Sequence, residues 1–155
     1  VFVPVITTFL GWGSFGWAKP VPVNPYNLRT KYADFWVSAA GIAANLVLFA
    51  VSYAATHIIL HGNQSLFLSI SPEILLNGAF IVMYVNLSLA IFNLIPVPPF
   101  DGMNILRSLI PSLKNKYLSF EHNPVFMIIA ILIAFQIFKV VFPLLWGLVI
   151  HSLGL

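Results

Sequence analysis

The 155-residue chain has few charged side chains and no cysteine. Only 7% of its residues are Asp, Glu, Lys or Arg, whereas a soluble domain carries roughly 25%. So few charges cannot cover a surface that faces water, and 60% of the residues are hydrophobic. The absence of cysteine excludes disulfide bonds and thiolate metal ligands. The composition therefore predicts an integral membrane protein whose solvent is the lipid bilayer.

Runs of basic residues are also missing, although the formal net charge is +3. The cations lie in loops between apolar segments, which is typical of topology signals, so we expect no nucleic-acid partner.

No Ser/His/Asp constellation or glycine-rich phosphate loop stands out. His57 and His61 have the spacing of paired zinc ligands, but Ile58 stands where a metalloprotease helix carries its Glu. A metal site shared by these two histidines is therefore not expected.

Three apolar segments are long enough to cross a bilayer, which takes about 20 residues. We predict spans over residues 35–60 and 74–95, followed by a last apolar run over 124–150 that contains Lys139 and Pro143. The last run either crosses once, with the lysine reaching towards the interface, or consists of two shorter pieces. The scattered Phe and Trp side chains are expected to face lipid and the membrane interface.

Lysine and arginine residues mark two segments on either side of the first two spans. They are Lys19, Arg29 and Lys31 before the first span, and Arg107, Lys114 and Lys116 after the second. The loop over residues 61–73 has neither Lys nor Arg. The positive-inside rule therefore predicts that the Lys19 loop and the Asp101 loop share the cytoplasmic side of the membrane.

The sequence NLIPVPPFDG, residues 93–102, ends the second span. Prolines at three of four consecutive positions cannot continue a helix, and non-helical backbone at membrane depth needs protein or a wet cavity around it. Asp101 follows, where a carboxylate is costly unless it is paired, protonated or bound to a metal. Either Asp101 is the N-cap of a helix that starts at Gly102, or it belongs to a polar site. A surface-lying amphipathic segment is expected over 103–120, interrupted at Pro111.

Polar side chains on both spans indicate a pocket beside this break. Asn86 and Asn93 are seven residues apart and share a helix face that leads to the break, although helix–helix hydrogen bonding is the alternative role. Ser38, Gly41 and Asn45 share one face of the first span, where a small residue between polar ones allows close approach of another helix. We expect the two faces to pack against each other.

The stretch KPVPVNP, residues 19–25, alternates Pro20 and Pro22 with Val21 and Val23. In an extended strand the proline edge lacks donors, while the valine edge keeps both donors and acceptors. Such a strand is protected on one side and open to an added peptide strand on the other. A polyproline-like connector is the alternative.

These stretches resemble one known family. NLIPVPPFDG resembles the Asn-x-x-Pro-x-Pro-x-x-Asp-Gly motif of the site-2 proteases, which are intramembrane zinc metalloproteases. GWAKPVPVNP resembles the loop after the first catalytic segment in the compact, PDZ-less branch, and SAAGIAANL resembles that branch's small-residue span, with Ile42 where a Pro is usual. The similarity covers nearly all of residues 10–107. The expected fold is an all-α polytopic membrane protein with about three transmembrane helices, a re-entrant Pro-rich hairpin and a helix broken at the Asp101 motif.

The resemblance implies a role for each feature. Asp101 would be the third protein ligand of a catalytic Zn²⁺, with Gly102 beside it. The amides that would line or support the site are Asn93, Asn86 and Asn45. The substrate would be a transmembrane helix that is locally unwound into an extended form. The hairpin residues expected to contact it are Pro20, Val21, Pro22, Val23, Asn24 and Pro25.

The HExxH motif, which would supply the other two ligands and a catalytic Glu, is absent from residues 1–155. In the family it precedes the GWAKPVPVNP-like loop, so residues 1–155 are expected to be one membrane-embedded domain from the C-terminal part of a longer zinc metalloendopeptidase. The resemblance implies hydrolysis of peptide bonds in transmembrane helices within a bacterial cell membrane. The expected partners are the lipid bilayer and a transmembrane protein substrate. A non-catalytic relative that binds membrane helices, and a small transporter subunit, are the alternatives.

Overall fold

The part of the chain that can be described belongs to a single unit. The computed structural model describes residues 32–62, 71–110, 112–113 and 123–155. The chain divides into units Val1–Thr30 and Lys31–Leu155, and every described residue lies in the second. The hairpin predicted over Pro20 to Pro25 therefore lies outside the described residues.

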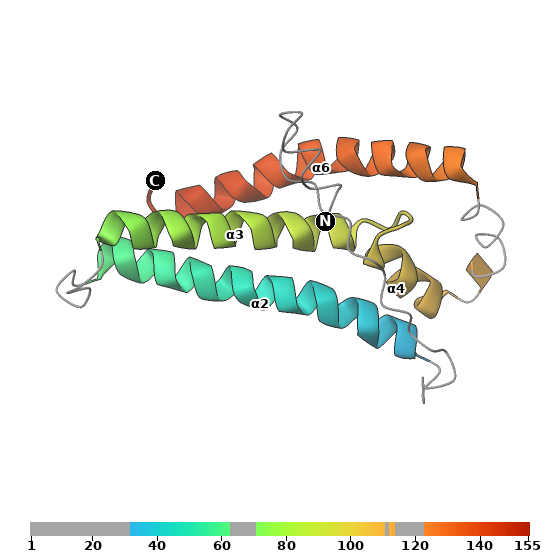
Figure 1. Ribbon diagram of the computed structural model, residues 1–155, viewed down its shortest axis with the longest axis horizontal. Coiled ribbons are helices and arrows are strands. Elements are labelled where there is room, and N and C mark those ends of the chain that lie inside the picture. Colours follow the sequence, from blue (N-terminus) through green and yellow to red (C-terminus); the bar gives the residue numbers. More distant parts are fainter. Residues whose placement is uncertain (1–31, 63–70, 111, 114–122) are drawn as a thin grey trace, which may run out of the picture. The chain divides into compact units, whose positions relative to one another are not determined.

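The described residues are mainly helical (Figure 1). In chain order the helices are α2 (Ala33–His61), α3 (Pro72–Leu94), α4 (Asp101–Leu109) and α6 (Pro124–Ser152). Helices α2, α3 and α6 are long and apolar enough to cross a membrane. This confirms the predicted all-α fold with three membrane helices. The last apolar run, for which the sequence left two alternatives, is one continuous helix with Pro143 inside it.

Local sequence explains where these helices begin. Helices α3 and α6 both have proline in their first turn, where its missing N–H costs no hydrogen bond. The Asn123 side chain caps α6 by accepting hydrogen bonds from the backbone N–H groups of Val125 at 3.0 Å and Phe126 at 3.5 Å. Asp34 and Glu73 lie in the first turns of α2 and α3, where the helix dipole favours negative charge.

Helix α2 packs on α3, and three of its five buried residues carry a hydroxyl group. Its buried residues are Ser38, Ile42, Ser52, Thr56 and Ile59. The Ser52 hydroxyl donates to the carbonyl of Leu48 at 2.8 Å, and the Thr56 hydroxyl donates to the carbonyl of Ser52 at 2.9 Å. Burial therefore leaves neither hydroxyl unsatisfied, and small side chains let helix backbones approach closely in lipid.

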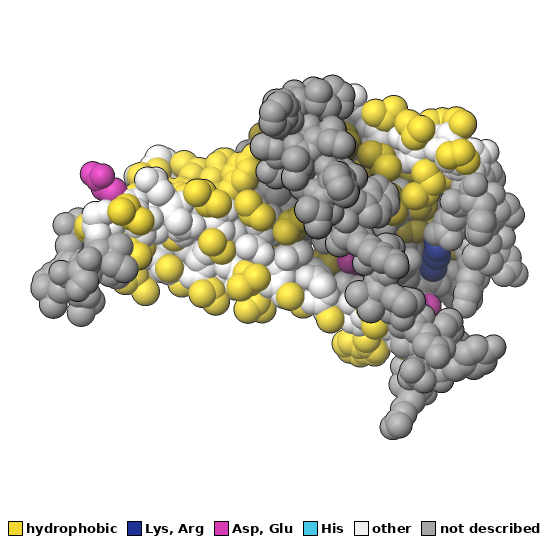
Figure 2. Space-filling model, viewed as in Figure 1, with side chains coloured by type: hydrophobic (Ala, Val, Ile, Leu, Met, Phe, Trp, Pro, Cys, Tyr) yellow, Lys and Arg dark blue, Asp and Glu magenta, His cyan; other side chains and the backbone are white. Residues whose placement is uncertain are grey.

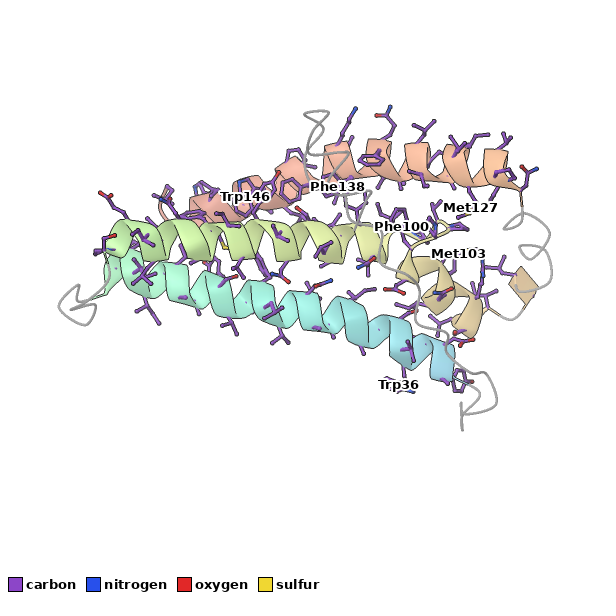
Figure 3. All side chains as sticks on the ribbon, in the orientation of Figure 1. Trp36, Phe100, Met103, Met127, Phe138 and Trp146 are labelled. Atoms are coloured by element: carbon purple, nitrogen blue, oxygen red, sulfur yellow. The ribbon has the colours of Figure 1, made fainter. Side chains whose placement is uncertain are left out.

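Helices α3 and α6 meet along an aromatic seam, which we define as Phe80, Tyr84 and Phe92 of α3 with Phe135, Phe138, Phe142 and Trp146 of α6. The rings of Phe92 and Phe138 stack with centroids 4.1 Å apart, and Tyr84 meets the edge of Phe142 at 4.9 Å. Figure 3 shows Phe138 and Trp146 on the side of α6 that faces α3.

The seam corrects the expectation that the scattered Phe and Trp side chains face lipid. Lipid tails are as apolar as the side chains, so helices associate through van der Waals packing, and stacked aromatic rings supply a large contact area with a preferred geometry. Trp36, at the start of α2, does follow the expectation, since it is 66% exposed (Figure 3).

The outer surface of the long helices is apolar. Figure 2 shows hydrophobic side chains distributed along them, and large side chains such as Val51, Ile81 and Leu148 are exposed.

Away from Asp101, the C-terminal ends of α2 and α6 are held together by two polar contacts. The Tyr53 and Ser152 hydroxyls lie 3.0 Å apart, and His61 Nε2 lies 3.1 Å from the Leu153 carbonyl oxygen.

Candidate functional site

The candidate site is built on the break between α3 and α4. Helix α3 ends at Leu94, and the prolines that follow redirect the chain through tight turns. The break satisfies part of its own backbone, because Val97 N–H donates to Ile95 O at 2.8 Å and Phe100 N–H donates to Val97 O at 3.0 Å. The peptide bond between Pro98 and Pro99 is cis. Six residues therefore turn the chain from one helix directly into the next.

Asp101 is the first residue of α4, which corrects the predicted limits of the break. One interpretation of the sequence began this helix at Gly102, with Asp101 as its N-cap, but Asp101 and Gly102 both lie in the first helical turn. The first turn of a helix carries partial positive charge, which favours an acidic residue such as Asp101. Neither Asp101 nor Gly102 is a proline. The N-cap is Phe100, and no side chain makes a capping hydrogen bond there. The interpretation of Asp101 as a simple N-cap is therefore wrong.

The carboxylate of Asp101 lies against Gly41 of α2. A Cβ built on Gly41 would lie 3.5 Å from Asp101 Oδ2, which is an ordinary van der Waals contact. Glycine leaves that side of the carboxylate uncovered, whereas a larger side chain at this position would cover it. The small-residue face of the first span therefore meets the acid itself.

A second contact one helical turn away fixes the register of α2 and α4. The Asn104 side-chain amide donates to the Ser38 hydroxyl at 3.3 Å. Asn104 follows Asp101 by three residues and Ser38 precedes Gly41 by three, so the two pairs place α4 antiparallel to this part of α2. Asn104 was not predicted as a site residue, although its spacing from Asp101 placed it on the same helix face. Ser38 and Gly41 were expected to face α3, whereas these two contact α4.

Gly102 allows α4 to start directly on the end of α3. A Cβ built on Gly102 would clash with the carbonyl oxygen of Leu94 and would lie 2.6 Å from the Leu94 carbonyl carbon and 2.7 Å from the Ile95 carbonyl oxygen. These are backbone atoms, which cannot move aside without shifting a helix. The adjacent Met103 is 1% exposed and anchors the same turn. The packing of α4 on α3 therefore requires glycine at position 102, in addition to any role of the Asp101 carboxylate.

The surroundings of the Asp101 carboxylate suit a cation. Among the described residues it has no hydrogen bond or ion pair, and it is only partly buried. The last carbonyl groups of α3, at Leu94 and Ile95, approach the neighbouring Gly102 backbone. The Asp101 carboxylate itself has no described polar partner, so it is available to a positively charged ligand.

The three amides of the predicted site differ in their surroundings. Asn86 is buried, but its amide donates to the Val82 carbonyl of its own helix at 2.8 Å. Asn93 lies half-buried in the last turn of α3, and Asn45 lies half-buried one turn after Gly41 on α2. In the part of the chain that the structure describes, none of the three is hydrogen-bonded to Asp101.

The two paired histidines lie far from Asp101. Their rings are 4.7 Å apart at the C-terminal end of α2. His57 follows Gly41 by 16 residues, which is about 24 Å along a helix at 1.5 Å per residue. HIILH is therefore too far from Asp101 to share a metal ion with it.

We tested whether the described side chains could hold a zinc ion. Within residues 32–62, 71–110, 112–113 and 123–155, no group of three or more His, Asp or Glu side chains is placed to bind a metal. A catalytic zinc takes three protein ligands and a water. The described residues therefore do not form a zinc site by themselves, and Asp101 could supply one ligand of such a site.

Comparison with known proteins supports the interpretation of the broken helix. Residues 68–137, which contain the whole NLIPVPPFDG motif, match Peptidase family M50. A Bacillus subtilis (strain 168) protein named "Putative zinc metalloprotease YwhC" is 33% identical over 109 residues, which cover 70% of this chain and 49% of that protein. The chain thus spans about half the length of this curated relative. No solved structure matches the chain significantly.

The fold and the broken-helix motif define a polytopic membrane protein with a carboxylate at the end of a membrane helix. The family match and the relative then identify its class. The chain belongs to the site-2 protease family, Peptidase family M50.

Proposed function

We propose that this chain is the part of a site-2-type intramembrane metalloprotease, of the compact PDZ-less branch, that supplies the carboxylate ligand of a catalytic zinc. The observation that carries the proposal is the Asp101 carboxylate, which lies against Gly41 and has no polar partner among the described residues. The family match over residues 68–137 supports the same role.

The fixed position of Asp101 favours a ligand over a mobile surface acid. Gly102 sets α4 on the end of α3, and the Asn104–Ser38 hydrogen bond holds α4 on α2. A metal ligand has to be held in place by packing and by neighbouring hydrogen bonds. Two contacts from two different helices meet this requirement.

The remaining ligands and the catalytic Glu would come from an HExxH helix outside residues 1–155. In this class of enzyme, zinc activates a water molecule and polarises the scissile carbonyl. In this proposal the described residues position the acid and exclude lipid from it, and Asn93, Asn86 and Asn45 provide a polar wall.

The proposed substrate is a transmembrane helix that unwinds locally before cleavage. Helical hydrogen bonds tie up each peptide group of such a substrate, so an extended form is needed to present the scissile amide. The open edge at Val21 and Val23 of the proposed hairpin would pair with the released backbone. We place the Lys19 and Asp101 loops on the cytoplasmic side of a bacterial cell membrane, because the basic residues flank the spans on that side.

The test is cleavage of a membrane-embedded substrate by the complete protein in vesicles or native membranes. Asp101→Asn keeps the size of the side chain and removes its charge. Loss of an outer-shell partner typically lowers activity by about 10–100-fold, so loss of a direct ligand should lower cleavage by at least about 100-fold. Asp34→Asn is the matched control, because Asp34 is an exposed acid in the first turn of α2. Cleavage by Asp101→Asn at the rate of the control would show that the proposed role is wrong.

A non-catalytic relative that binds membrane helices is the second candidate. It is favoured by one observation, that the described residues do not complete a set of three metal ligands. Such a protein would bind the same substrate helix and leave it uncut in both the native and the Asp101→Asn forms.

A further inference from the structure

Two histidines lie side by side at the end of α2 that is remote from Asp101. His57 and His61 are one helical turn apart, both side chains are exposed, and their ring centroids are 4.7 Å apart. His61 is the last residue of α2, so the pair lies within about 6 Å of the helix end at 1.5 Å per residue. Both imidazoles are therefore within reach of water and dissolved ions at the end of the span.

A hydrogen bond to the end of α6 determines which ring nitrogen of His61 is free. His61 Nε2 lies 3.1 Å from the Leu153 carbonyl oxygen, and because a carbonyl only accepts, Nε2 must carry the proton. The neutral ring then has its lone pair on Nδ1. Histidines that bind metals usually donate their other N–H to a carbonyl or carboxylate, which orients the ring and makes it a more basic ligand. His61 therefore makes the hydrogen bond that is typical of a metal ligand.

His57 is also available to a metal ion. In the part of the chain that the structure describes, its side chain has no hydrogen bond or ion pair, so either ring nitrogen can bind. Ile58 stands where a metalloprotease helix carries its Glu, which excludes catalysis by an HExxH mechanism at this pair. It leaves the two imidazoles able to bind a metal ion.

The separation of the two rings suits one shared metal ion. A metal in the plane of an imidazole and about 2.0–2.1 Å from its nitrogen lies about 3.2 Å from the ring centroid. Centroids 4.7 Å apart then correspond to an angle of about 95° between the two nitrogens at the metal. This angle is closer to the right angle of a square-planar or tetragonal site than to the tetrahedral angle that zinc prefers. Cu²⁺ takes such geometries and binds nitrogen ligands more tightly than the other divalent first-row ions.

The pair supplies two protein ligands and no third. Within the described ranges, no group of three or more His, Asp or Glu side chains is placed to bind a metal. Residues 63–71, which follow α2 in the sequence, contain no His, Asp or Glu. Water would therefore fill the remaining positions around an ion held by the two histidines.

We propose that His57 and His61 form a binding site for Cu²⁺, in which His61 coordinates through Nδ1 and water completes the shell. The sequence alone led to the opposite expectation, and the ring geometry and the Leu153 hydrogen bond are the reasons for the proposal. The site does not depend on the proposed proteolysis. A bound ion draws electrons from the His61 ring, so its Nε2–H becomes a stronger donor and the contact between α2 and α6 tightens.

Copper titration of the purified, tag-free chain in detergent tests the site, with CuCl₂ as the probe. We expect the electron paramagnetic resonance spectrum of bound Cu²⁺ to show hyperfine splitting from two nitrogens. His57→Ala should raise the Kd for Cu²⁺ by at least tenfold, because loss of even an outer-shell partner typically costs about 10–100-fold in metal affinity. This variant leaves the His61–Leu153 hydrogen bond in place. His151→Ala is the matched control, since His151 is an exposed histidine in the last turn of α6, and it should bind Cu²⁺ like the native chain.

A relocated histidine provides a second arm of the test. Ala54 is exposed on α2, and His57→Ala combined with Ala54→His keeps the number of histidines unchanged. The pair is then seven residues apart, about 10 Å along the helix, which one ion cannot span, so this variant should bind Cu²⁺ as weakly as His57→Ala. Native affinity in either variant, an equal loss of affinity in His151→Ala, or a spectrum without splitting from two nitrogens would overturn the proposal.

Discussion

Gly102 shows how a single hydrogen atom in place of a side chain positions the candidate site. A Cβ added at Gly102 would collide with the backbone carbonyls of Leu94 and Ile95, so the start of α4 rests directly on the end of α3. Asp101 is the preceding residue, and its carboxylate position relative to Gly41 depends on this close packing. The Asp-Gly pair should therefore be sensitive to any added side chain at Gly102.

We expect Gly102→Ala to lower the free energy of unfolding by about 1–3 kcal/mol, because a methyl group forced into a packed site shifts backbone or side chains. Gly78→Ala is the matched control, since a Cβ there would meet nothing within 4 Å. Alanine in a helix interior is favoured over glycine by roughly 0.5–1 kcal/mol, so the control should be as stable as the native chain or slightly more stable. Denaturant titration in mixed micelles measures both. Equal stabilities of the two variants would contradict the close packing.

At the scale of single residues, the sequence predicted which side chains matter better than what they contact. Asp101 was singled out because a carboxylate after three prolines has no simple role in lipid. Its contact with Gly41 could not be predicted, because the two residues are 60 positions apart and the pairing depends on how α4 turns back on α2. Asn86 was expected either to line a polar pocket or to bond across helices, but an amide can also reach the carbonyl four residues earlier, and here it does so.

At the scale of the elements, the sequence predicted where the helices lie, but it predicted only in part which helices pack against each other. Continuous apolar sequence between polar ends is enough to place every boundary of α2, α3 and α6 within two residues. The aromatic seam was missed, although Phe138, Phe142 and Trp146 recur every four residues and so lie along one face of α6. In lipid, an apolar face does not by itself reveal whether it meets a helix or the bilayer. The four-residue spacing of the aromatic rings was the available signal.

The seam predicts that α3 and α6 depend on Phe142, which is 6% exposed and contacts Phe138, Tyr84 and Trp146. Phe→Ala in a water-soluble core costs about 3–5 kcal/mol. In a bilayer the solvent is also apolar, so mainly the lost packing remains, and we expect Phe142→Ala to cost about 1–2 kcal/mol by the same micelle titration.

The control for the seam is Leu148→Ala on the same helix. Leu148 is 68% exposed, and its truncation should change stability by less than about 0.5 kcal/mol. If both alanine variants had the same stability, the seam would contribute nothing to the association of α3 and α6.

At the scale of the whole molecule, three crossings fix which helix ends share a side. The start of α2, the end of α3 and the start of α6 lie on one side if each long helix crosses once. The basic residues predict that this side is cytoplasmic. Residues 1–155 contain no cysteine, so a thiol introduced into this chain is unique within it and reports the orientation directly.

We expect Leu109→Cys, at the exposed end of α4, to react with a membrane-impermeant maleimide only after the cells are permeabilised. Ser71→Cys, at the exposed start of α3, should react in intact cells. The reverse labelling pattern would show that the predicted orientation is wrong, and labelling of both positions in intact cells would contradict a single crossing by α3.

The account depends on Asp101 holding a metal ion, and zinc content tests this most directly. The complete protein, purified in detergent without chelators, should contain about one zinc per chain, the number expected for a single catalytic site. Asp101→Asn should retain a small fraction of that zinc, whereas the control Asp34→Asn should retain all of it. A complete protein without zinc, or an Asp101→Asn variant with its full complement, would contradict the proposed role of the carboxylate.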